Sequence, residues 1–268
     1  MSRNFELLQR AENERRREPH RGNGRRERAA WFNEPTTFEP LAGVRSFRNL
    51  YQKKGDEVSE VSKLVHSLFI EPDPVTAHSV AFANVDAAAA RNAVCARAGE
   101  LLASRVAGSV CLLDANLAAP SLHQYFGAEN HFGWAEALQQ ARPIQDFLRS
   151  HERANLSFVT SGAVVEGWED LFREEAIAGR MQQLGEQFDY VLALCPPPSA
   201  YPQAQILGRL ADGMVLVVEA NSTRCNTAVQ LKAELEEAGV RLLGTVLNNR
   251  TFPIPDVIYS GLDLVFRR

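Results

Sequence analysis

The sequence has few of the residues that build disulfide frameworks and metal sites. Its 268 residues include four cysteines and six histidines, and no CxxC pair occurs. Because the cysteines are scattered, we expect free thiols in a reducing cytoplasm, and the dispersed histidines favour no zinc or iron site. No apolar run approaches the ~18–20 residues that span a bilayer, and the charged first residues are not of signal-peptide type. These absences predict a cytoplasmic protein without a transmembrane segment.

Charge is spread unevenly along the chain. Residues 1–30 carry nine Arg against five Glu, about +4, so the remainder carries about −8 because the whole chain is −4. A basic arm on an acidic body can bind an acidic surface, a membrane leaflet or nucleic acid. The alternative is a solvated, disordered tail. We expect a largely disordered basic arm over residues 1–45 and a single α/β domain over residues 46–268.

From residue 78 onward, apolar segments alternate with amphipathic ones. Strands are predicted at 79–84, 109–115, 156–162, 190–195, 213–220 and 241–248, and helices at 56–69, 87–104, 133–149, 169–186, 202–211 and 224–238. Near-continuous apolar strands that alternate with helices indicate a parallel sheet covered on both faces. The fold class is therefore an α/β three-layer sandwich of about six or seven strands, which binds ligands beyond the carboxyl ends of its strands.

Four segments resemble one protein family in order and spacing: "SVCLLDANLAAPSLHQYFG" (109–127), "FDYVLALCPPP" (188–198), "LADGMVLVVEANSTR" (210–224) and "EEAGVRLLGTVLNN" (236–249). The family is the bacterial tyrosine kinases of polysaccharide assembly (BY-kinases), in particular the type found with exosortase clusters. The resemblance covers about residues 65–250. It implies a P-loop NTPase-like fold with deviant Walker motifs, binding of ATP and magnesium, autophosphorylation of a C-terminal tyrosine cluster, and an inner-membrane polysaccharide co-polymerase as partner.

The first Walker motif of the family aligns with "VDAAAARN" (85–92) in this sequence. The loop glycine then falls on Ala90, the lysine on Arg91 and the magnesium-binding Ser/Thr on Asn92. Alanines favour ordinary helix over a loop that curls around phosphate. The Arg91 guanidinium does not replace a compact ammonium, and an amide such as Asn92 is a weaker magnesium ligand. Asp86 fits an N-cap that would begin the helix early.

The other motifs depart from the family pattern as well. The second motif keeps Asp114, but Asn116 stands in place of its partner carboxylate. In the third motif Leu194 replaces the Asp that ends the strand, and the C-terminal end has Tyr259 alone. Phosphoryl transfer depends almost wholly on positioning and on metal and lysine electrostatics. We therefore expect no catalytic residues, no bound metal and no cofactor, with Arg91, Asp114 and Asn248 as the possible residual binding residues.

Each of these residues also has a structural interpretation. Asp114 either anchors a ligand or caps the turn that follows its strand, and Arg91 either binds an anion or lies on the surface. Asn248 matches an asparagine that contacts adenine in related ATPases, and it equally suits the end of a strand. The apolar face of residues 58–69 either resembles the family's oligomer-forming helix or packs on its own core.

The favoured hypothesis is a catalytically inactive BY-kinase-like protein, a scaffold or regulatory partner in bacterial exopolysaccharide biosynthesis and export. Its partners would be an inner-membrane co-polymerase or an active kinase homologue, with a homo-oligomer as a further possibility, and it would lie peripherally at the inner membrane through a partner. One alternative is a divergent, active ATP-binding tyrosine autokinase. Another is a positioning protein that associates with membrane or nucleic acid, although binding to nucleic acid is not expected.

Overall fold

Eight strands form one sheet in the computed structural model, which describes residues 45–46, 57–70, 77–86, 93–163, 166–220 and 222–248. Their order is β1-β8-β7-β2-β6-β3-β5-β4, and every neighbouring pair is parallel except β4–β5. The strands are β1 (Arg45–Ser46), β2 (Ser79–Asn84), β3 (Val110–Asp114), β4 (Arg149–Ser150), β5 (Leu156–Val159), β6 (Tyr190–Cys195), β7 (Gly213–Glu219) and β8 (Leu242–Asn248). All six predicted strands are confirmed, and the two-residue strands β1 and β4 are additional.

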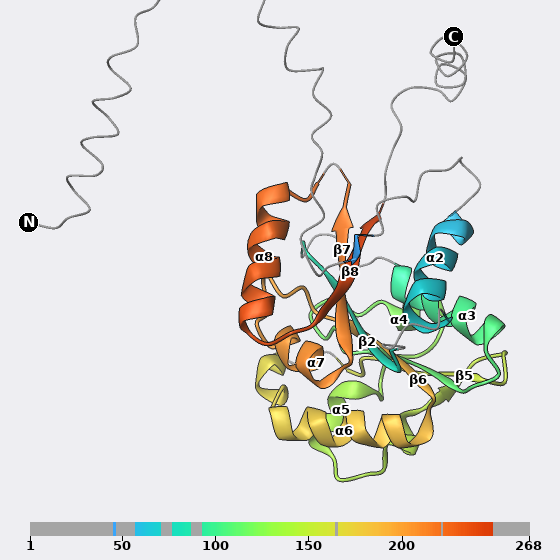
Figure 1. The fold of residues 1–268 in the computed structure, drawn as a ribbon. Helices are drawn as coiled ribbons and strands as arrows, with labels where there is room; N and C mark the ends of the chain where they lie inside the picture. Colours follow the sequence, from blue (N-terminus) through green and yellow to red (C-terminus); the bar gives the residue numbers. More distant parts are fainter. Residues whose placement is uncertain are drawn as a thin grey trace, which may run out of the picture. The chain divides into compact units, whose positions relative to one another are not determined.

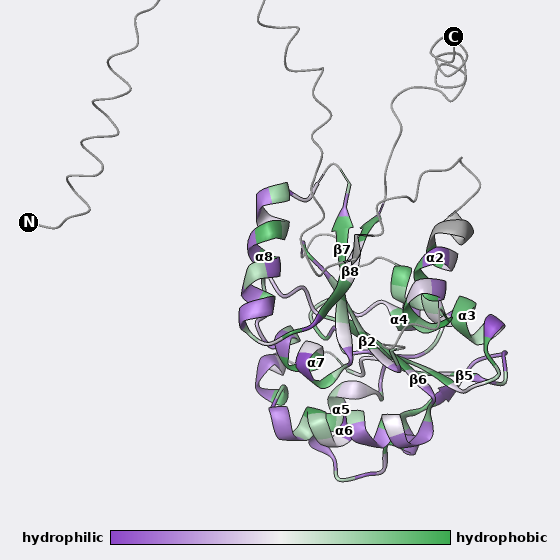
Figure 2. Cartoon of the chain, in the orientation of Figure 1, coloured by the Kyte–Doolittle hydropathy of each residue, from purple (hydrophilic) through white to green (hydrophobic). Residues whose placement is uncertain are grey.

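Helices cover both faces of this sheet (Figure 1). They are α2 (Glu57–Val65), α3 (Val94–Arg105), α4 (Leu122–Tyr125), α5 (Trp134–Gln139), α6 (Glu174–Gln187), α7 (Ala204–Leu210) and α8 (Cys225–Glu237). Alternate residues of β2 show the two layers: Ala81 and Ala83 pack with α5–α8, whereas Val80 and Phe82 pack with α2–α4. Hydrophobic residues accordingly run along the strands, while the helices carry hydrophilic residues as well (Figure 2). The predicted three-layer α/β sandwich is confirmed.

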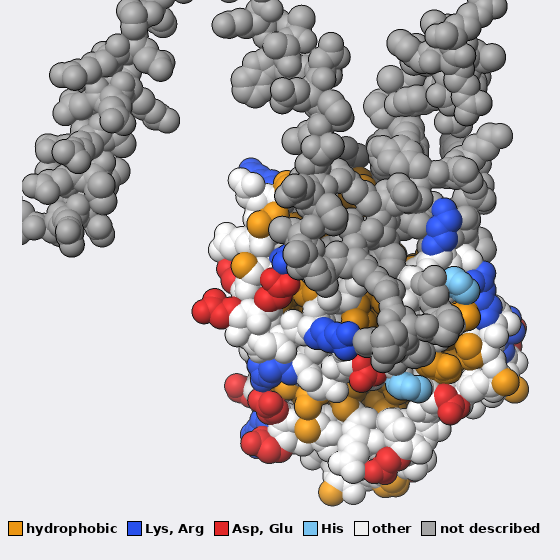
Figure 3. Space-filling view, viewed as in Figure 1, with side chains coloured by type: hydrophobic (Ala, Val, Ile, Leu, Met, Phe, Trp, Pro, Cys, Tyr) orange, Lys and Arg blue, Asp and Glu red, His pale blue; other side chains and the backbone are white. Residues whose placement is uncertain are grey.

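Several predictions from the sequence fall outside the described residues. These are the basic arm apart from Arg45, the segment 87–92 and the C-terminal segment that holds Tyr259. On the described surface seen in Figure 3, acidic and basic side chains are interspersed with hydrophobic ones. None of the helices in the described ranges has the length and apolar character that a membrane-spanning segment requires.

The helix predicted over residues 133–149 is wrong in its extent. α5 ends at Gln139, Gln140 adopts an extended conformation, and a 3-10 helix (Ile144–Phe147) leads into β4. Pro143 lacks an N–H and disfavours a helical residue before it, so the helix cannot continue through this point. The buried guanidinium of Arg180 in α6 donates to the carbonyl oxygens of Ala137, Gln140 and Arg142, which satisfies acceptors that α5 leaves free at its end.

Two further helices begin later than predicted. A 3-10 helix (Trp168–Leu171) precedes α6, which begins at Glu174 after an extended Arg173. The described part of the helix predicted from residue 87 begins at Val94, with Ala93 as its N-cap and without a side-chain cap. Asp86 is therefore not the N-cap of α3, and the segment 87–92, which would continue the predicted helix back to Asp86, lies outside the described residues.

The helix predicted over residues 56–69 packs on the core of its own chain. α2 continues into one turn of π-helix (His66–Ile70), and its apolar residues Leu64, Val65, Leu68 and Phe69 are buried against α3 and the sheet. The Phe69 ring also meets the Tyr190 ring edge-on at 5.9 Å. This arrangement corresponds to the structural interpretation of the apolar stripe.

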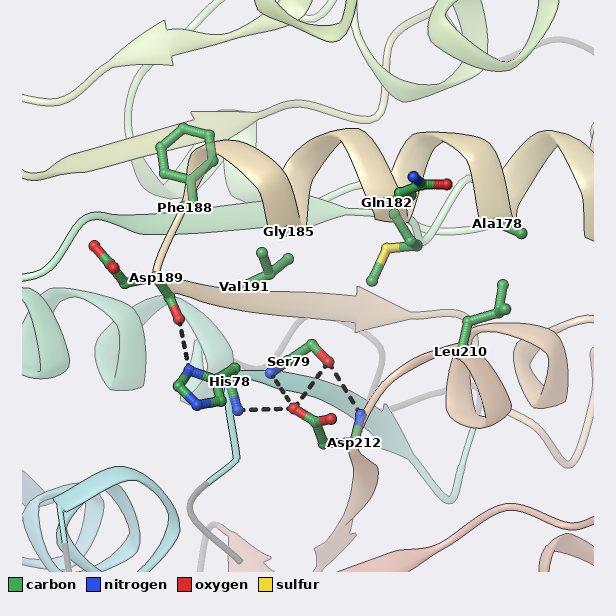
Figure 4. A pocket seen from close by; sticks show the side chains of 11 residues that line it. His78, Ser79, Ala178, Gln182, Gly185, Phe188, Asp189, Val191, Leu210 and Asp212 are labelled. Carbon is green, nitrogen blue, oxygen red and sulfur yellow. Dashed lines mark hydrogen bonds between the residues drawn. The ribbon is translucent and has the colours of Figure 1, made fainter.

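Two serine–aspartate pairs join neighbouring strands at the amino edge of the sheet. Ser79 donates through its N–H (2.8 Å) and its hydroxyl (3.2 Å) to Asp212 Oδ2, and the Asp212 N–H donates back to Ser79 Oγ at 3.0 Å (Figure 4). Ser109 and Asp189 repeat the arrangement at 2.7, 2.8 and 3.1 Å. The first pair ties the start of β2 to that of β7, and the second ties β3 to β6. We call them the amino-edge clips.

The Asp189 clip makes a testable contribution to stability. Hydrogen bonds from the Ser109 N–H and hydroxyl hold the pKa of the Asp189 carboxyl below its usual value. A lowered folded-state pKa stabilises the fold above the unfolded pKa, and this contribution is lost as the pH falls through the folded value. We expect Asp189→Asn to lower the melting temperature at pH 7 by roughly 2–4 °C and the gap to close below pH 4. Glu152→Gln is the control, since this exposed side chain has no hydrogen bond among the described residues. A gap that stays constant with pH would contradict the prediction.

Candidate functional site

The carboxyl edge of the sheet collects polar side chains at the ends of its strands. β3 ends at Asp114, β7 at Glu219 and β8 at Asn248, around the central strand β2. Ligands of open parallel sheets bind at this edge, so this is the candidate site. Of the predicted site residues, the structure describes Asp114, Asn116, Leu194 and Asn248, whereas Ala90, Arg91 and Asn92 lie outside the described residues.

The carboxylate of Asp114 is fully buried and accepts hydrogen bonds from the backbone. The Asn116 N–H donates to Oδ1 at 3.2 Å, and the N–H groups of Ser121 and Leu122 donate to Oδ2 at 2.9 Å each. The last two belong to the start of α4, where the first N–H groups lack partners within the helix. Asp114 thus caps the turn after β3, as its structural interpretation proposed.

Burial and hydrogen bonding shift the pKa of the Asp114 carboxyl in opposite directions. Loss of solvent around the carboxylate raises its pKa to about 6, although the three backbone N–H groups lower it. The group is therefore still mostly ionised at neutral pH.

Leu194 lies beside Asp114 on the neighbouring strand. The two residues are register partners in the β3–β6 ladder, and the Ala115 N–H donates to the Leu194 carbonyl at 2.9 Å. The Leu194 side chain is 2% exposed and lines a recess of about 250 Å³ between α3 and α4. The other lining residues are Ala93, Ala96, Ser121, Leu122, Gln124 and Tyr125. A leucine at this strand end offers no oxygen to a metal or to its water shell.

Asn116 contributes a buried amide two residues after Asp114. Its Oδ1 accepts a hydrogen bond from the Ala119 N–H at 3.2 Å, whereas its Nδ2 has no hydrogen-bond partner among the described residues. An unsatisfied buried donor costs about 1–3 kcal/mol. The amide donates rather than accepts on that side, which is the reverse of what a metal cation requires.

A second polar network lies on the other side of β2, and the sequence interpretation missed its members Thr223 and Glu219. Thr223 donates a hydrogen bond to Asp86, and the Thr223 hydroxyl accepts one from the Glu219 N–H at 3.0 Å. Asn248 Nδ2 donates to Glu219 Oε1 at 2.8 Å. Acidic and hydroxyl residues just after the apolar strands β2 and β7 were the signal available in the sequence. Asn248, proposed as an adenine contact or a strand-end residue, ends β8 and uses its amide on this carboxylate.

The proline-rich loop after β6 is anchored on both sides. Pro196, Pro197 and Pro198 are buried, and the hydroxyl of Ser199 donates to the carbonyl of Val85, just beyond β2. The ring of Tyr201 packs against Trp168 at 5.0 Å between centroids. The proline rings also fix the backbone φ angles of three residues, so the loop has few conformations open to it beside the candidate site.

The thiols near the site are not suited to nucleophilic chemistry. Burial raises the pKa of Cys95 and of Cys195, and the Asp114 carboxylate beside them raises both further. Since the thiolate is the reactive form, both residues act as small core side chains. Nor does any group of three or more His, Cys, Asp or Glu residues suited to a metal ion occur in the described ranges.

Known proteins with similar sequences are tyrosine kinases of bacteria. Over 141 residues the chain is 29% identical to tyrosine-protein kinase YwqD of Bacillus subtilis, which covers 53% of this chain and 60% of YwqD. It is 24% identical to the putative tyrosine-protein kinase CapB of Staphylococcus aureus over 51% of this chain and 60% of CapB. This chain is a homologue of the bacterial tyrosine-protein kinases. It spans about 60% of the length of these two kinase homologues, and no protein-family model matches it.

Solved structures share the fold. The chimeric protein CapA2B2 superimposes with a TM-score of 0.66 at 22% identity, over 72% of this chain and 85% of that one. The fold is P-loop NTPase-like, as the resemblance implied. The segments 109–127, 188–198 and 210–224 thus lie in the same fold as the kinase homologues, with Asp114, Leu194 and Glu219 at its carboxyl edge.

The pKa of Asp114 predicts a distinctive pH profile for a variant. A folded-state pKa raised to about 6 means that this carboxyl stabilises the fold most below its unfolded pKa and loses that contribution as the pH rises through 6. From pH 4 to pH 7 the loss is about 2–3 kcal/mol. The introduced asparagine side chain does not titrate. We therefore expect Asp114→Asn to have a lower free energy of unfolding than wild type at pH 4, and this difference to be smaller by about 2–3 kcal/mol at pH 7. Urea unfolding at both pH values measures the gap. Asp170→Asn, at an exposed site, provides the control, and parallel profiles for Asp114→Asn and wild type would refute the assignment.

Proposed function

We propose that this chain is a catalytically inactive relative of the bacterial tyrosine kinases that acts as a scaffold or regulatory partner in exopolysaccharide biosynthesis and export. The observation that carries the proposal is the pair Asp114–Leu194 at the carboxyl edge. Both carboxylate oxygens of Asp114 accept hydrogen bonds from backbone N–H groups, and its register partner is a buried leucine that lines a recess.

The described residues do not fit magnesium and ATP. Leu194 supplies no ligand, and the free side of the Asn116 amide is a donor. On the other side of β2 the Asn248 amide is engaged with Glu219. Carboxylates at Asp86, Asp114 and Glu219 add negative charge where nucleotide phosphates would lie, and this charge opposes their approach. We therefore derive no phosphoryl-transfer step for this chain.

A relative that keeps the kinase fold without its chemistry still has surfaces for protein partners. We propose as partners an inner-membrane polysaccharide co-polymerase or an active kinase homologue, with self-association as a third mode, so that the protein lies peripherally at the membrane through its partner. The support is the homology to tyrosine kinases together with the resemblance described from the sequence.

Nucleotide titration tests the inactive-kinase proposal directly. We expect calorimetric titration of the full-length protein with ATP or ADP, with and without magnesium, to give no binding heat and no rise in melting temperature. The physical reason is the lack of metal ligands and the negative charge at the strand ends. Incubation with ATP and magnesium should leave phosphotyrosine undetectable by mass spectrometry.

An active bacterial tyrosine kinase purified in the same way is the positive control for both measurements. Magnesium-dependent binding in the micromolar range, or phosphotyrosine that disappears in Asp114→Ala, would refute the inactive-kinase proposal in favour of a divergent autokinase. The partner role has a separate readout: adding this protein to an active homologue from the same cell should change the rate of that kinase's autophosphorylation. An unchanged rate, together with no retention on a co-polymerase cytoplasmic segment, would contradict the scaffold proposal.

A further inference from the structure

A cleft lies at the amino edge of the sheet, opposite the candidate site. It has a volume of about 530 Å³ and lies between α6 on one side and the starts of β2 and β7 on the other (Figure 4). Because it lies at the strand starts, it is separated from the candidate site by the length of the strands. Nothing in the kinase homology assigns a role to it.

One wall of the cleft is a single face of α6. Ala178, Met181, Gln182 and Gly185 line it at helical spacings of three and four residues, and Phe188 continues the wall past the helix end. Together with Val191 and Leu210 these residues give this side of the cleft a mostly apolar surface that suits the stem of a long side chain.

The opposite wall carries the Asp212 carboxylate, of which one oxygen accepts no hydrogen bond from the described residues. All hydrogen bonds that the described residues give to the Asp212 carboxylate, from His78 and Ser79, end on Oδ2. Its Oδ1 accepts none among the described residues, and Figure 4 shows the carboxylate beside His78 and Ser79. No lysine or arginine lines the described cleft. The cleft therefore presents net negative charge.

His78 gives this wall a flat surface. Its ring lies nearly parallel to that of Tyr190, with an interplanar angle of 17° and centroids 5.9 Å apart, and its Nδ1 bonds the Asp189 carbonyl at 3.1 Å. A ring held in this way offers a planar partner for another planar group. Guanidinium groups stack on such rings, and ammonium groups do so less well.

Gly185 leaves space in the cleft, although no neighbouring atom requires a glycine at this position. A Cβ at this position would meet no atom within 4 Å, and the residue lies inside α6, where glycine is unfavourable compared with alanine. Gly179, in the same helix, has the same free space but does not line the cleft. Glycine at position 185 thus leaves room for an incoming chain.

We propose that this cleft binds an arginine side chain presented by an extended segment of a partner protein. The guanidinium donates to Asp212 Oδ1 and lies along the His78 ring, while the methylene stem covers the apolar α6 face. Charge complementarity favours a cation, and the planar His78 ring favours the planar guanidinium of arginine over a lysine ammonium. The proposal does not rest on the lack of kinase activity.

The probe is a capped Gly-Arg-Gly peptide titrated into the full-length protein, followed by NMR shifts of the Gly185 and His78 backbone amides. The matched probe carries citrulline, which has nearly the shape of arginine without its charge. We expect saturable shifts with arginine and at least tenfold weaker binding with citrulline. Equal binding of the two peptides, or no shift at either amide up to millimolar peptide, would overturn the proposal.

A matched pair of glycine substitutions locates the binding. Gly185→Leu should fill the cleft and abolish binding, whereas Gly179→Leu should bind as wild type does, and both changes favour the helix. Asp212→Asn, with folding verified by its melting curve, should weaken arginine binding about tenfold and leave citrulline binding unchanged. Arginine binding that survives in Gly185→Leu, or that is lost equally in Gly179→Leu, would refute the site. No nucleotide enters this test, so its outcome is independent of the kinase question.

Discussion

The fold depends on the hydrogen-bonded register of β2 between β6 and β7. This strand pairs in parallel on both sides over nearly its whole length, and its residues Ala81, Phe82 and Ala83 are fully buried. A parallel strand at this position cannot slip by one residue without exchanging the two faces that pack against the two helix layers. The start of β2 therefore fixes the amino edge of the sheet, and its end fixes the candidate site.

The strands were predictable because each is a short apolar run bounded by polar residues, and all six run within a few residues of their predicted ends. Helix extents were less predictable, because periodicity alone does not show where a chain turns. The predicted helix stops before Pro143. The Gln140 carbonyl, left without a helical partner, accepts a hydrogen bond from Arg180, which lies forty residues later in the sequence. Tertiary contacts of this kind leave no local signal.

The candidate site was predictable as a set of residue types and not as a set of contacts. Leu194, in place of the Asp of the family pattern, predicts that a metal ligand is missing, whereas for Asp114 the sequence leaves both a ligand anchor and a turn cap open. Which atoms Asp114, Asn248 and Asp86 bind follows from distances between strands that lie far apart in the sequence. The partnership of Asp86 with Thr223 is the clearest instance, because it joins residues separated by more than half of the chain.

The amino-edge clips have a consequence for how this chain can change over evolutionary time. The Ser79–Asp212 and Ser109–Asp189 pairs join β2 to β7 and β3 to β6 at the edge remote from the candidate site. Residues at the carboxyl edge are consequently not needed to align β2 with β7 or β3 with β6. Substitutions at the carboxyl edge can therefore alter ligand chemistry while the clips keep these strands aligned, so that loss or gain of an activity on this scaffold is a small step in sequence space.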